Sequence, residues 1–282
     1  MSKQWYNFSI KGDEMNNLKH VIKGIIIGIA TLVPGVSGGT MAIILGVYDD
    51  MIHAVGSFFK NIKKNIVFLG TLGVGGVIGI ALFSRVIEYG LEHFKYPIVY
   101  LFLGIIIGGI PVLYKRATTG KKKMSDYIYF IVGLLLIVGM SLYNVTIVNL
   151  ASSTGIWNFI FLIVAGIIIA VALILPGIST SFMLLALGLY DITLKAINTV
   201  DIPFLLPIVI GAALGVIGTT KVLENLLNNK PRQTYMLILG FVVGSIIEVF
   251  PGIPTSFNIL YSIITFVIGY LLIQFMSKKY SD

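Results

Sequence analysis

One stretch near the N-terminus decides the fold: residues 32–40 read LVPGVSGGT. Proline, three glycines, a serine and a threonine crowd into an apolar run that would otherwise continue as a membrane helix. Proline lacks an N–H group and clashes with the preceding turn, and glycine permits the tight backbone turn that must follow. The stretch therefore predicts a helix break at Pro34 and Gly35.

The same break occurs a second time, at an offset of 142 residues. Residues 24–55 align with residues 166–197, and 14 of the 32 aligned positions are identical. The identities include Pro176 and Gly177, which repeat the Pro-Gly pair, and a G-x-Y-D block after each break. Shared membrane composition could match the aliphatic residues, but not a PG-x-S sequence followed by G-x-Y-D. The chain is therefore an internal duplication, as is common among secondary transporters.

The duplication extends beyond the Pro-Gly segments. At an offset of 136 residues, 73–92 aligns with 209–228 and 101–109 aligns with 237–245. The six-residue change of offset falls in the loop after Asp49, which is predicted to be longer in the first half.

Composition identifies a polytopic membrane protein. The 282 residues are 57% apolar and 11% charged, with a mean hydropathy of +0.96, whereas a soluble domain carries about 25% charged residues. There are no cysteines, and His20, His53 and His93 lack metal-ligand spacing, so we expect no metal and no cofactor. The net charge of +8 comes from basic residues in loops, which membrane topology explains more simply than nucleic-acid binding.

The distribution of Lys and Arg predicts the topology. If each Pro-Gly segment enters the membrane and returns to the same side, 17 basic residues lie on one side and three, Arg85, Lys95 and Lys195, on the other. The positive-inside rule makes the richer side the cytoplasm. If each Pro-Gly segment crossed once, lysine-rich loops would lie outside, so we discard that topology.

Each half therefore combines a helical hairpin, re-entrant or crossing twice, with three transmembrane helices. Because three is odd, the second half is inverted relative to the first. Whether the second hairpin, about 157–190, dips into the membrane or spans it twice stays open, since both have the same parity. The transmembrane helices are expected at residues 66–84, 97–113, 127–147, 204–220, 234–250 and 257–276.

The predicted organisation is one all-α membrane domain with both termini in the cytoplasm. An interfacial N-terminal segment (1–23) precedes a first repeat (24–147). An inverted second repeat (157–276) and a short tail (277–282) follow.

The residues after each break are candidates for binding an anion. A new helix is expected to begin at about Val36 and Ile178, and its first N–H groups have no partner within the helix. Each such group costs several kcal/mol in hydrocarbon, and an anionic ligand would satisfy it. The candidate phosphate-binding residues are Ser37, Gly38, Gly39 and Thr40 in the first copy and Ser179, Thr180 and Ser181 in the second.

The alternative for each break is structural. It would then be a polar cap satisfied by its own hydroxyls, with Ser37 or Ser179 in capping range and the glycines serving only close helix packing. Two such breaks, inverted and with matching Y-D endings, favour a ligand site.

Two cations are candidates for the phosphate as well. Arg85 and Lys221 are equivalent in the repeat, and inversion would place them at opposite faces. Each has a glutamate three residues later, Glu88 or Glu224, so simple helical pairing is the alternative.

Further carboxylates are candidates for a coupling or supporting role. Glu248 is the most isolated acid, and an intramembrane carboxylate is a functional candidate by default. Asp49 and Asp191 are expected to cap or orient the hairpin ends, and binding of a coupling ion is the alternative.

The two Pro-Gly segments resemble those of the bacterial polyprenyl-phosphate translocases, the PopT family. The matching blocks are LVPGVSGGTMAIILGVYDDMI and LILPGISTSFMLLALGLYDITL, and the resemblance covers the chain from about residue 20. It implies a transporter, not an enzyme, that returns undecaprenyl phosphate from the outer to the inner leaflet of the bacterial plasma membrane. Thr180 and Ser181 replace the glycines of the first copy, so unequal contributions from the two hairpins are expected.

This resemblance agrees with the chemistry of the segments, because moving a polyprenyl phosphate lipid through the bilayer requires shielding only its head. We expect the head-group site to alternate between the two hairpins, with a proton or sodium ion on a carboxylate such as Glu248 as the coupling partner. An ion-coupled transporter of a small soluble anion is the alternative. An enzyme is disfavoured, because no clustered His/Asp or paired-Asp motif is present and Ser37 has no base nearby in sequence.

Overall fold

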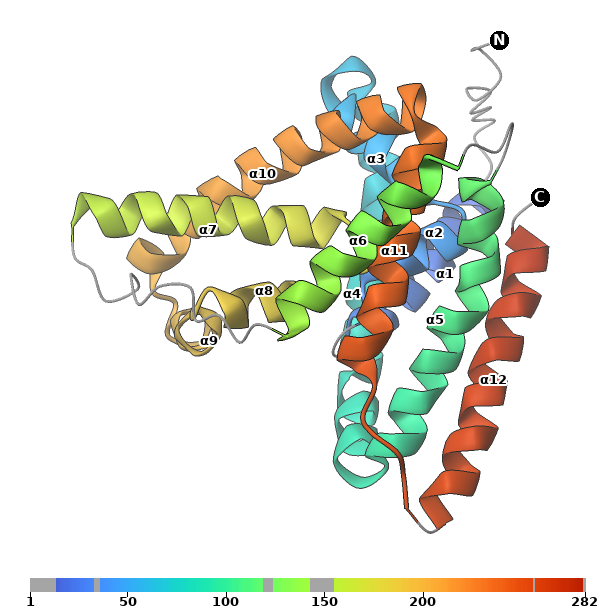
Figure 1. Ribbon diagram of the computed structural model, residues 1–282. Coiled ribbons are helices and arrows are strands. Elements are labelled where there is room, and N and C mark those ends of the chain that lie inside the picture. The colour runs from blue at the N-terminus through green and yellow to red at the C-terminus, as the bar shows by residue number, and fades with distance from the viewer. Residues whose placement is uncertain (1–13, 33–35, 119–123, 143–154, 256, 281–282) are drawn as a thin grey trace.

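The computed structural model describes residues 14–32, 36–118, 124–142, 155–255 and 257–280, which contain helices and no strand (Figure 1). Six of the described helices, α4, α5, α7, α10, α11 and the Phe257–Ser277 part of α12, are long and apolar enough to span a bilayer. The predicted all-α membrane fold is confirmed at this level. The helices are α1 (Glu14–Thr31), α2 (Gly38–Ile44), α3 (Tyr48–Gly56), the 3-10 turn η1 (Phe58–Lys60), α4 (Ile62–His93), α5 (Lys95–Ala117), α6 (Asp126–Leu142), α7 (Ile156–Ile174), α8 (Thr180–Ala186), α9 (Tyr190–Thr199), α10 (Ile202–Asn229), α11 (Pro231–Val249) and α12 (Phe257–Tyr280).

Some boundaries differ from those predicted. α4 continues to His93, well past the expected end at residue 84, because Arg85 and Glu88 end the apolar run but are good helix formers. α1 begins at Glu14, so the boundary expected after residue 23 falls inside a helix, and α12 likewise extends beyond residue 276. Residues 143–147 of the predicted third crossing lie outside the described residues.

The helices follow the same order in both halves. α1 and α7 contain 18 and 19 residues, α2 and α8 seven each, and α3 and α9 nine and ten. Gly46 and Gly188, at equivalent positions between the short helices, have positive φ values of 68° and 67°, which glycine adopts readily. The aligned sequences therefore adopt the same local structure.

Glycines bring α1 against α4 and α7 against α10. A Cβ atom built on Gly24 would overlap the carbonyl oxygen of Leu72, and one on the equivalent Gly166 would overlap that of Ile208. Backbones approach this closely only where no side chain intervenes. Equivalent residues thus make equivalent contacts, and the two helix pairs are built alike.

Both helix pairs are parallel. Val21 lies against Gly75 and Ile25 against Gly79, so the contacts advance together along α1 and α4. The chain between α1 and α4 must therefore return to the end at which α1 begins, and it does so through the short helices α2 and α3. The matching contacts between α7 and α10 join Ile163 to Gly211 and Ile167 to Gly215.

The remaining helices exchange partners between the halves. α5 packs on α12, and α11 packs on α6. A Cβ atom on Gly104 would overlap the carbonyl oxygen of Phe266, and one on the equivalent Gly240 would overlap that of Phe130. α5 and α11 lie side by side and run in opposite directions (Figure 1). The two halves are therefore interlocked.

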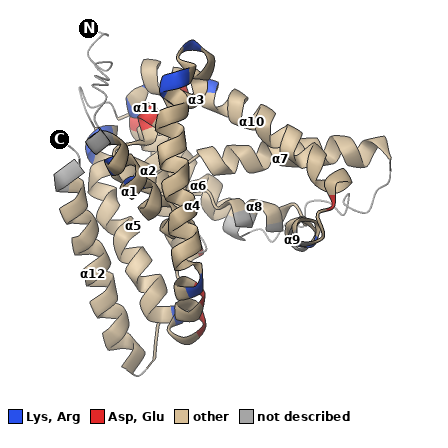
Figure 2. Ribbon diagram, turned by 180° about the vertical axis from the view of Figure 1, so that it is seen from behind, with Lys and Arg blue, Asp and Glu red and all other residues tan. Residues whose placement is uncertain are grey.

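The halves differ in the direction of α4 and its repeat equivalent, α10. α4 runs along the direction of α5, whereas α10 and its partner α7 extend away from the α5–α12 bundle, across that direction (Figures 1 and 2). α3 packs on α10, and no comparable packing joins the described parts of α9 and α4. Most Lys and Arg residues gather at the end of the bundle that holds α3 and the start of α11 (Figure 2).

Replacing Gly75 with alanine is expected to destabilise the α1–α4 pair. The added methyl group would overlap the backbone of Val21, and such overpacking costs about 1–3 kcal/mol. Gly73→Ala is the matched control in the same helix, because its Cβ would meet nothing within 4 Å. It should leave stability unchanged or raise it by up to about 1 kcal/mol. Equal thermal unfolding temperatures in detergent for the two variants would contradict the packing.

Candidate functional site

The two Pro-Gly segments meet in the middle of the molecule. A Cβ atom built on Gly39 would lie 3.3 Å from Cα of Pro176, so the start of α2 touches the turn that follows α7. α7 ends at Ile174, two residues before this proline. Pro34 and Gly35, the predicted break of the first copy, lie outside the described residues.

The central helices hold this junction on two sides. Gly177 has φ +84°, and a Cβ atom on it would lie 2.6 Å from the carbonyl carbon of Phe241 in α11. A Cβ atom on Gly109 of α5 would overlap the side chain of Ile44 in α2. The junction therefore packs between α5 and α11, the antiparallel pair at the centre of the fold.

Buried hydroxyl groups lie at the junction. Ser37, Thr40 and Ser179 are only 8%, 3% and 8% exposed. Ser37 is the N-cap of α2, but its hydroxyl makes no capping hydrogen bond. Because Ser37 stays extended (φ −86°, ψ 129°), α2 begins at Gly38, two residues later than predicted, and α8 begins correspondingly at Thr180. A cap satisfied by its own hydroxyl therefore does not describe Ser37.

The tyrosine of the first G-x-Y-D block connects the two halves. The Tyr48 side chain is buried, and its hydroxyl donates a hydrogen bond of 2.9 Å to the carbonyl oxygen of Ile174, the last residue of α7. The final carbonyl groups of a helix have no partner within it, so this bond satisfies one of them. Tyr48 thereby fixes α3 to the helix that leads into the second Pro-Gly segment.

A polar cluster joins α3, α5 and α11 at the end rich in Lys and Arg. Nη1 of Arg116 donates to Oδ2 of Asp49 and to the Tyr235 hydroxyl, at 2.8 Å each. The Tyr235 hydroxyl in turn donates to Oδ1 of Asp49 at 2.5 Å. Asp49 therefore joins the start of α3 to α5 and α11, through partners that the sequence did not predict.

A second polar contact holds α3 on α10. Nδ1 of His53 lies 2.7 Å from Oε1 of Glu224. A Cβ atom on Gly56 would overlap the Glu224 carboxylate, so α3 comes close to this side chain of α10. Glu224 thus contacts His53 in the other half of the chain, and no ion pair with Lys221 is found among the described residues.

Asp50 lies between Asp49 and His53 in the sequence of α3. Burial, followed by the neighbouring Asp49 carboxylate, raises the pKa of Asp50 above its ordinary value. Lys23, His53 and Arg116 act in the opposite direction. Asp50 therefore takes up a proton more readily than an exposed aspartate does.

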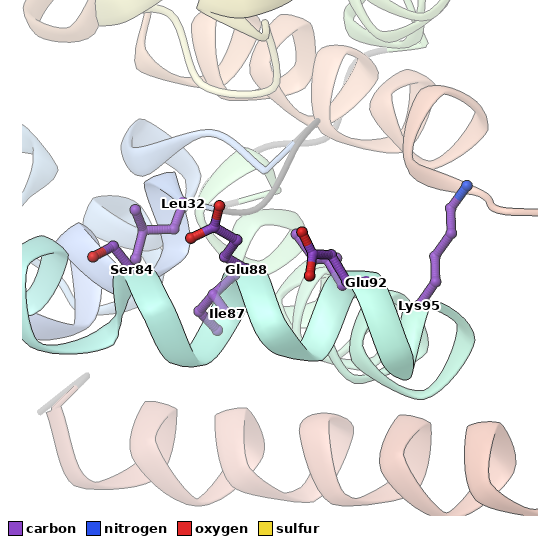
Figure 3. Close-up of a pocket in the computed structure, with 7 residues that line it drawn as sticks. Leu32, Ser84, Ile87, Glu88, Glu92 and Lys95 are labelled. Atoms are coloured by element: carbon purple, nitrogen blue, oxygen red, sulfur yellow. The ribbon is translucent and has the colours of Figure 1, made fainter.

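Glu88 is the repeat equivalent of Glu224 and lies near the C-terminal end of α4. Its side chain lines an open pocket of about 570 Å³ (Figure 3). Ser84, Glu88 and Glu92 project from one side of the helix, and Lys95 follows at the start of α5 (Figure 3). The other lining residues are Leu32, Ile87 and Leu91.

The structure does not bring the remaining predicted residues to the junction. Arg85 and Lys221 are exposed, and within the described residues neither forms a hydrogen bond or ion pair with a Pro-Gly segment. Glu248 is half-buried near the end of α11. The side chains of Ser181 and Asp191 lie outside the described residues.

Arg116, Tyr235 and His53 were not identified from the sequence. Arg116 follows Lys115 at the end of an apolar run, where a basic residue is an ordinary membrane-topology signal. The residues that meet in the cluster are 67 to 186 positions apart, so no spacing pattern connects them. Tyr48 was also not proposed as a site residue, although its place in the repeated G-x-Y-D block was a signal in the sequence.

Known proteins resemble this chain over most of its length. A family model described as undecaprenyl phosphate translocase-like matches residues 27–263. The polyprenyl-phosphate transporter of Staphylococcus aureus is 32% identical over 272 residues, which cover 90% of this chain and 93% of that protein. The polyprenyl-phosphate transporter of Vibrio cholerae is 30% identical over 254 residues, or 85% of this chain and 80% of that protein. No solved structure matches. The chain therefore belongs to the undecaprenyl phosphate translocase-like family, which agrees with the resemblance of its Pro-Gly segments.

Proposed function

We propose that this protein moves undecaprenyl phosphate from the outer to the inner leaflet of the bacterial plasma membrane, so that the carrier lipid can be used again. The names of its relatives support a polyprenyl phosphate as substrate. The observation that carries the proposal is the meeting of two repeat-related Pro-Gly segments, with three buried hydroxyls, between α5 and α11. Such a lipid needs shielding only at its anionic head, since the tail stays in hydrocarbon.

The head-group site combines both Pro-Gly segments. The hydroxyls of Ser37, Thr40 and Ser179 donate to the phosphate oxygens, and such bonds to a charged acceptor are stronger than neutral ones. Gly38 and Gly39 let the phosphate approach the backbone, because no side chain covers their N–H groups. Thr180 and Ser181 complete the set on the second segment.

The proposed topology places both termini and the end rich in Lys and Arg in the cytoplasm. Antiparallel α5 and α11 occupy equivalent positions, as expected if the second half is inverted (Figure 1). Parallel α1 and α4 support a first hairpin that returns to its side of entry. Each half is then a hairpin with a Pro-Gly break plus three transmembrane helices.

The difference between the halves supports alternation between two states. In the repeat, the His53–Glu224 contact corresponds to Lys195 and Glu88. The first pair is in contact at 2.7 Å, whereas Glu88 lies in the open pocket and no ion pair with Lys195 is found among the described residues. We infer that the opposite state closes α9 on α4 and releases α3 from α10, which moves the opening of the site from one face to the other.

Charged residues serve the two faces. Arg85 and Lys221 are exposed, one in each half, and attract the phosphate as it enters or leaves the site. A coupling proton or sodium ion would be bound by one of the carboxylates already singled out by the sequence, since acids within a membrane domain commonly carry such ions. These are Glu88, Glu224, Glu248, Asp49 and Asp191.

Removing two junction hydroxyls tests the site. Ser37→Ala with Ser179→Ala is expected to slow transport about tenfold or more, since a hydrogen bond to a charged group contributes about 1.5–3 kcal/mol. Transport is measured as the exchange of undecaprenyl phosphate between vesicle leaflets. Ser245→Ala is the matched control, because this equally buried hydroxyl donates to Val242 of its own helix. Equal rates for the double variant and the wild type would contradict the assignment.

A parallel measurement separates lipid transport from transport of a soluble anion. Vesicles containing the protein are supplied with radiolabelled inorganic phosphate, and uptake into the lumen is followed. The lipid site predicts no uptake above that of protein-free vesicles. Phosphate uptake without exchange of the lipid would replace the proposed substrate by a soluble anion.

A further inference from the structure

Two donors from different helices converge on the carboxylate of Asp49. Arg116 reaches Oδ2 at 2.8 Å, and the Tyr235 hydroxyl reaches Oδ1 at 2.5 Å. The guanidinium also lies 5.6 Å from the centre of the Tyr235 ring, which helps to hold it in place. Donors placed around two oxygens of one anion suit a phosphate as well as a carboxylate.

The donors of this cluster lie on long helices, and its acceptor lies on a short, more exposed one. Arg116 and Tyr235 belong to the long helices α5 and α11 and are 30% and 6% exposed, whereas the Asp49 side chain, on short α3, is 52% exposed. Both hydrogen bonds from Arg116 leave from Nη1. Within the described residues none leaves from Nη2 or Nε, so N–H groups remain for further oxygens of a larger anion.

We propose that Arg116 and Tyr235 bind the phosphate head group at the Lys- and Arg-rich end, and that Asp49 occupies their site when no lipid is bound. This assignment rests on the proposed function. In the proposed topology the cluster faces the cytoplasm, so it receives the head group as it leaves the Pro-Gly junction for the inner leaflet.

The second half offers no equivalent site. At the offset of 136 residues, Arg116 corresponds to Gly252 and Tyr235 to Val99, neither of which has a side chain that could donate to a phosphate. Only Asp49 has an equivalent, Asp191. This pair of donors therefore has no counterpart at the repeat-equivalent positions, which gives the two ends different affinities for the lipid.

Binding at this site would also loosen α3. Asp49 lies in the first turn of α3 and His53 one turn later, and their contacts with Arg116 and Glu224 both hold this helix in place. A phosphate that displaces Asp49 removes the first contact and leaves the second. Occupancy of the site thereby favours the state in which α3 leaves α10.

The test measures binding of farnesyl phosphate, a short polyprenyl phosphate, by titration calorimetry of the purified full-length protein in detergent. Asp49→Asn is expected to bind it about three- to tenfold more tightly, because the competing carboxylate charge is gone. This factor corresponds to the free energy of one exposed to half-buried ion pair. Arg116→Lys should bind about tenfold more weakly, since it loses the planar fork. Tyr235→Phe should weaken binding about fivefold, the worth of one hydrogen bond.

Two controls make the outcomes distinct. Lys115→Gln removes a positive charge from the same turn and should leave the affinity within about twofold, since exposed charges act weakly. Farnesol lacks the phosphate and should bind all variants equally weakly. Tighter binding by Asp49→Asn cannot arise from misfolding. If the wild type binds farnesyl phosphate, and Asp49→Asn and Arg116→Lys bind it as well as the wild type does, this assignment is wrong but the proposed function still stands. If the wild type does not distinguish farnesyl phosphate from farnesol, the proposed function falls with it.

Discussion

Replacing Gly177 with alanine is expected to reduce transport to the rate of protein-free vesicles. Gly177 has φ +84°, a conformation that costs an L-residue about 1–2 kcal/mol. In addition, the new Cβ atom would lie 2.6 Å from the carbonyl carbon of Phe241, a backbone atom in the middle of α11. Since α11 is held on both sides by α5 and α6, the Pro-Gly turn must move, and the contact between Gly39 and Pro176 opens with it.

Gly252→Ala separates the two causes. Gly252 has a similar φ of +89°, but a Cβ atom there would meet nothing within 4 Å. Gly252→Ala should lose only the stability that a positive φ costs an alanine, which is seen as a small loss of thermal stability in detergent. It should transport at close to the wild-type rate. A Gly177→Ala variant that transports as fast as Gly252→Ala would show that the junction tolerates displacement, which contradicts its assignment as the head-group site.

Joining α3 to α10 by a disulfide is expected to stop transport reversibly. The natural chain has no cysteine, so Gly56→Cys with Thr220→Cys introduces the only pair. A Cβ atom on Gly56 would lie 3.7 Å from Cγ2 of Thr220, which is close enough for a disulfide after a small adjustment. If α3 must leave α10 during the cycle, oxidised protein should transport no faster than protein-free vesicles, and reduction should restore the rate.

Each single-cysteine variant shows how the substitution alone affects transport. Gly56→Cys alone also shows the effect of the overlap between position 56 and Glu224. Mass spectrometry of the oxidised protein shows the fraction cross-linked, against which the residual rate is compared. Continued transport by fully cross-linked protein would mean that α3 stays on α10 throughout, and the proposed exchange between the two states would then be wrong.

Much of the fold followed from the sequence, because its strongest signals are local. Pro176 and the repeated glycines restrict the backbone wherever they occur, and apolar runs of membrane length fix the helices. The glycine contacts follow the repeat alignment, since Gly24 and the equivalent Gly166 make the same contact in the two halves. The extension of α4 was missed because the charges of Arg85 and Glu88 ended the apolar run but not the helix.

The polar contacts between distant helices could not be predicted in this way. Arg116, Tyr235 and Asp49 come from three helices, and only the packing of α5, α11 and α3 brings them together. Helical spacing pairs Glu224 with Lys221, three residues away, but in the structure Glu224 contacts His53 of another helix. A helical spacing rule describes neighbours on one helix and contains no information on a partner supplied by the other half of the chain.

Leaflet-resolved exchange of undecaprenyl phosphate is the most direct measurement. Vesicles are prepared with and without the purified protein, with the labelled lipid at first only in the outer leaflet, and its loss from accessibility to an added soluble phosphatase is followed over time. Transport predicts rapid loss in vesicles with the wild type and slow loss with Ser37→Ala/Ser179→Ala. Equal rates in vesicles with and without the wild-type protein would contradict a role in moving this lipid.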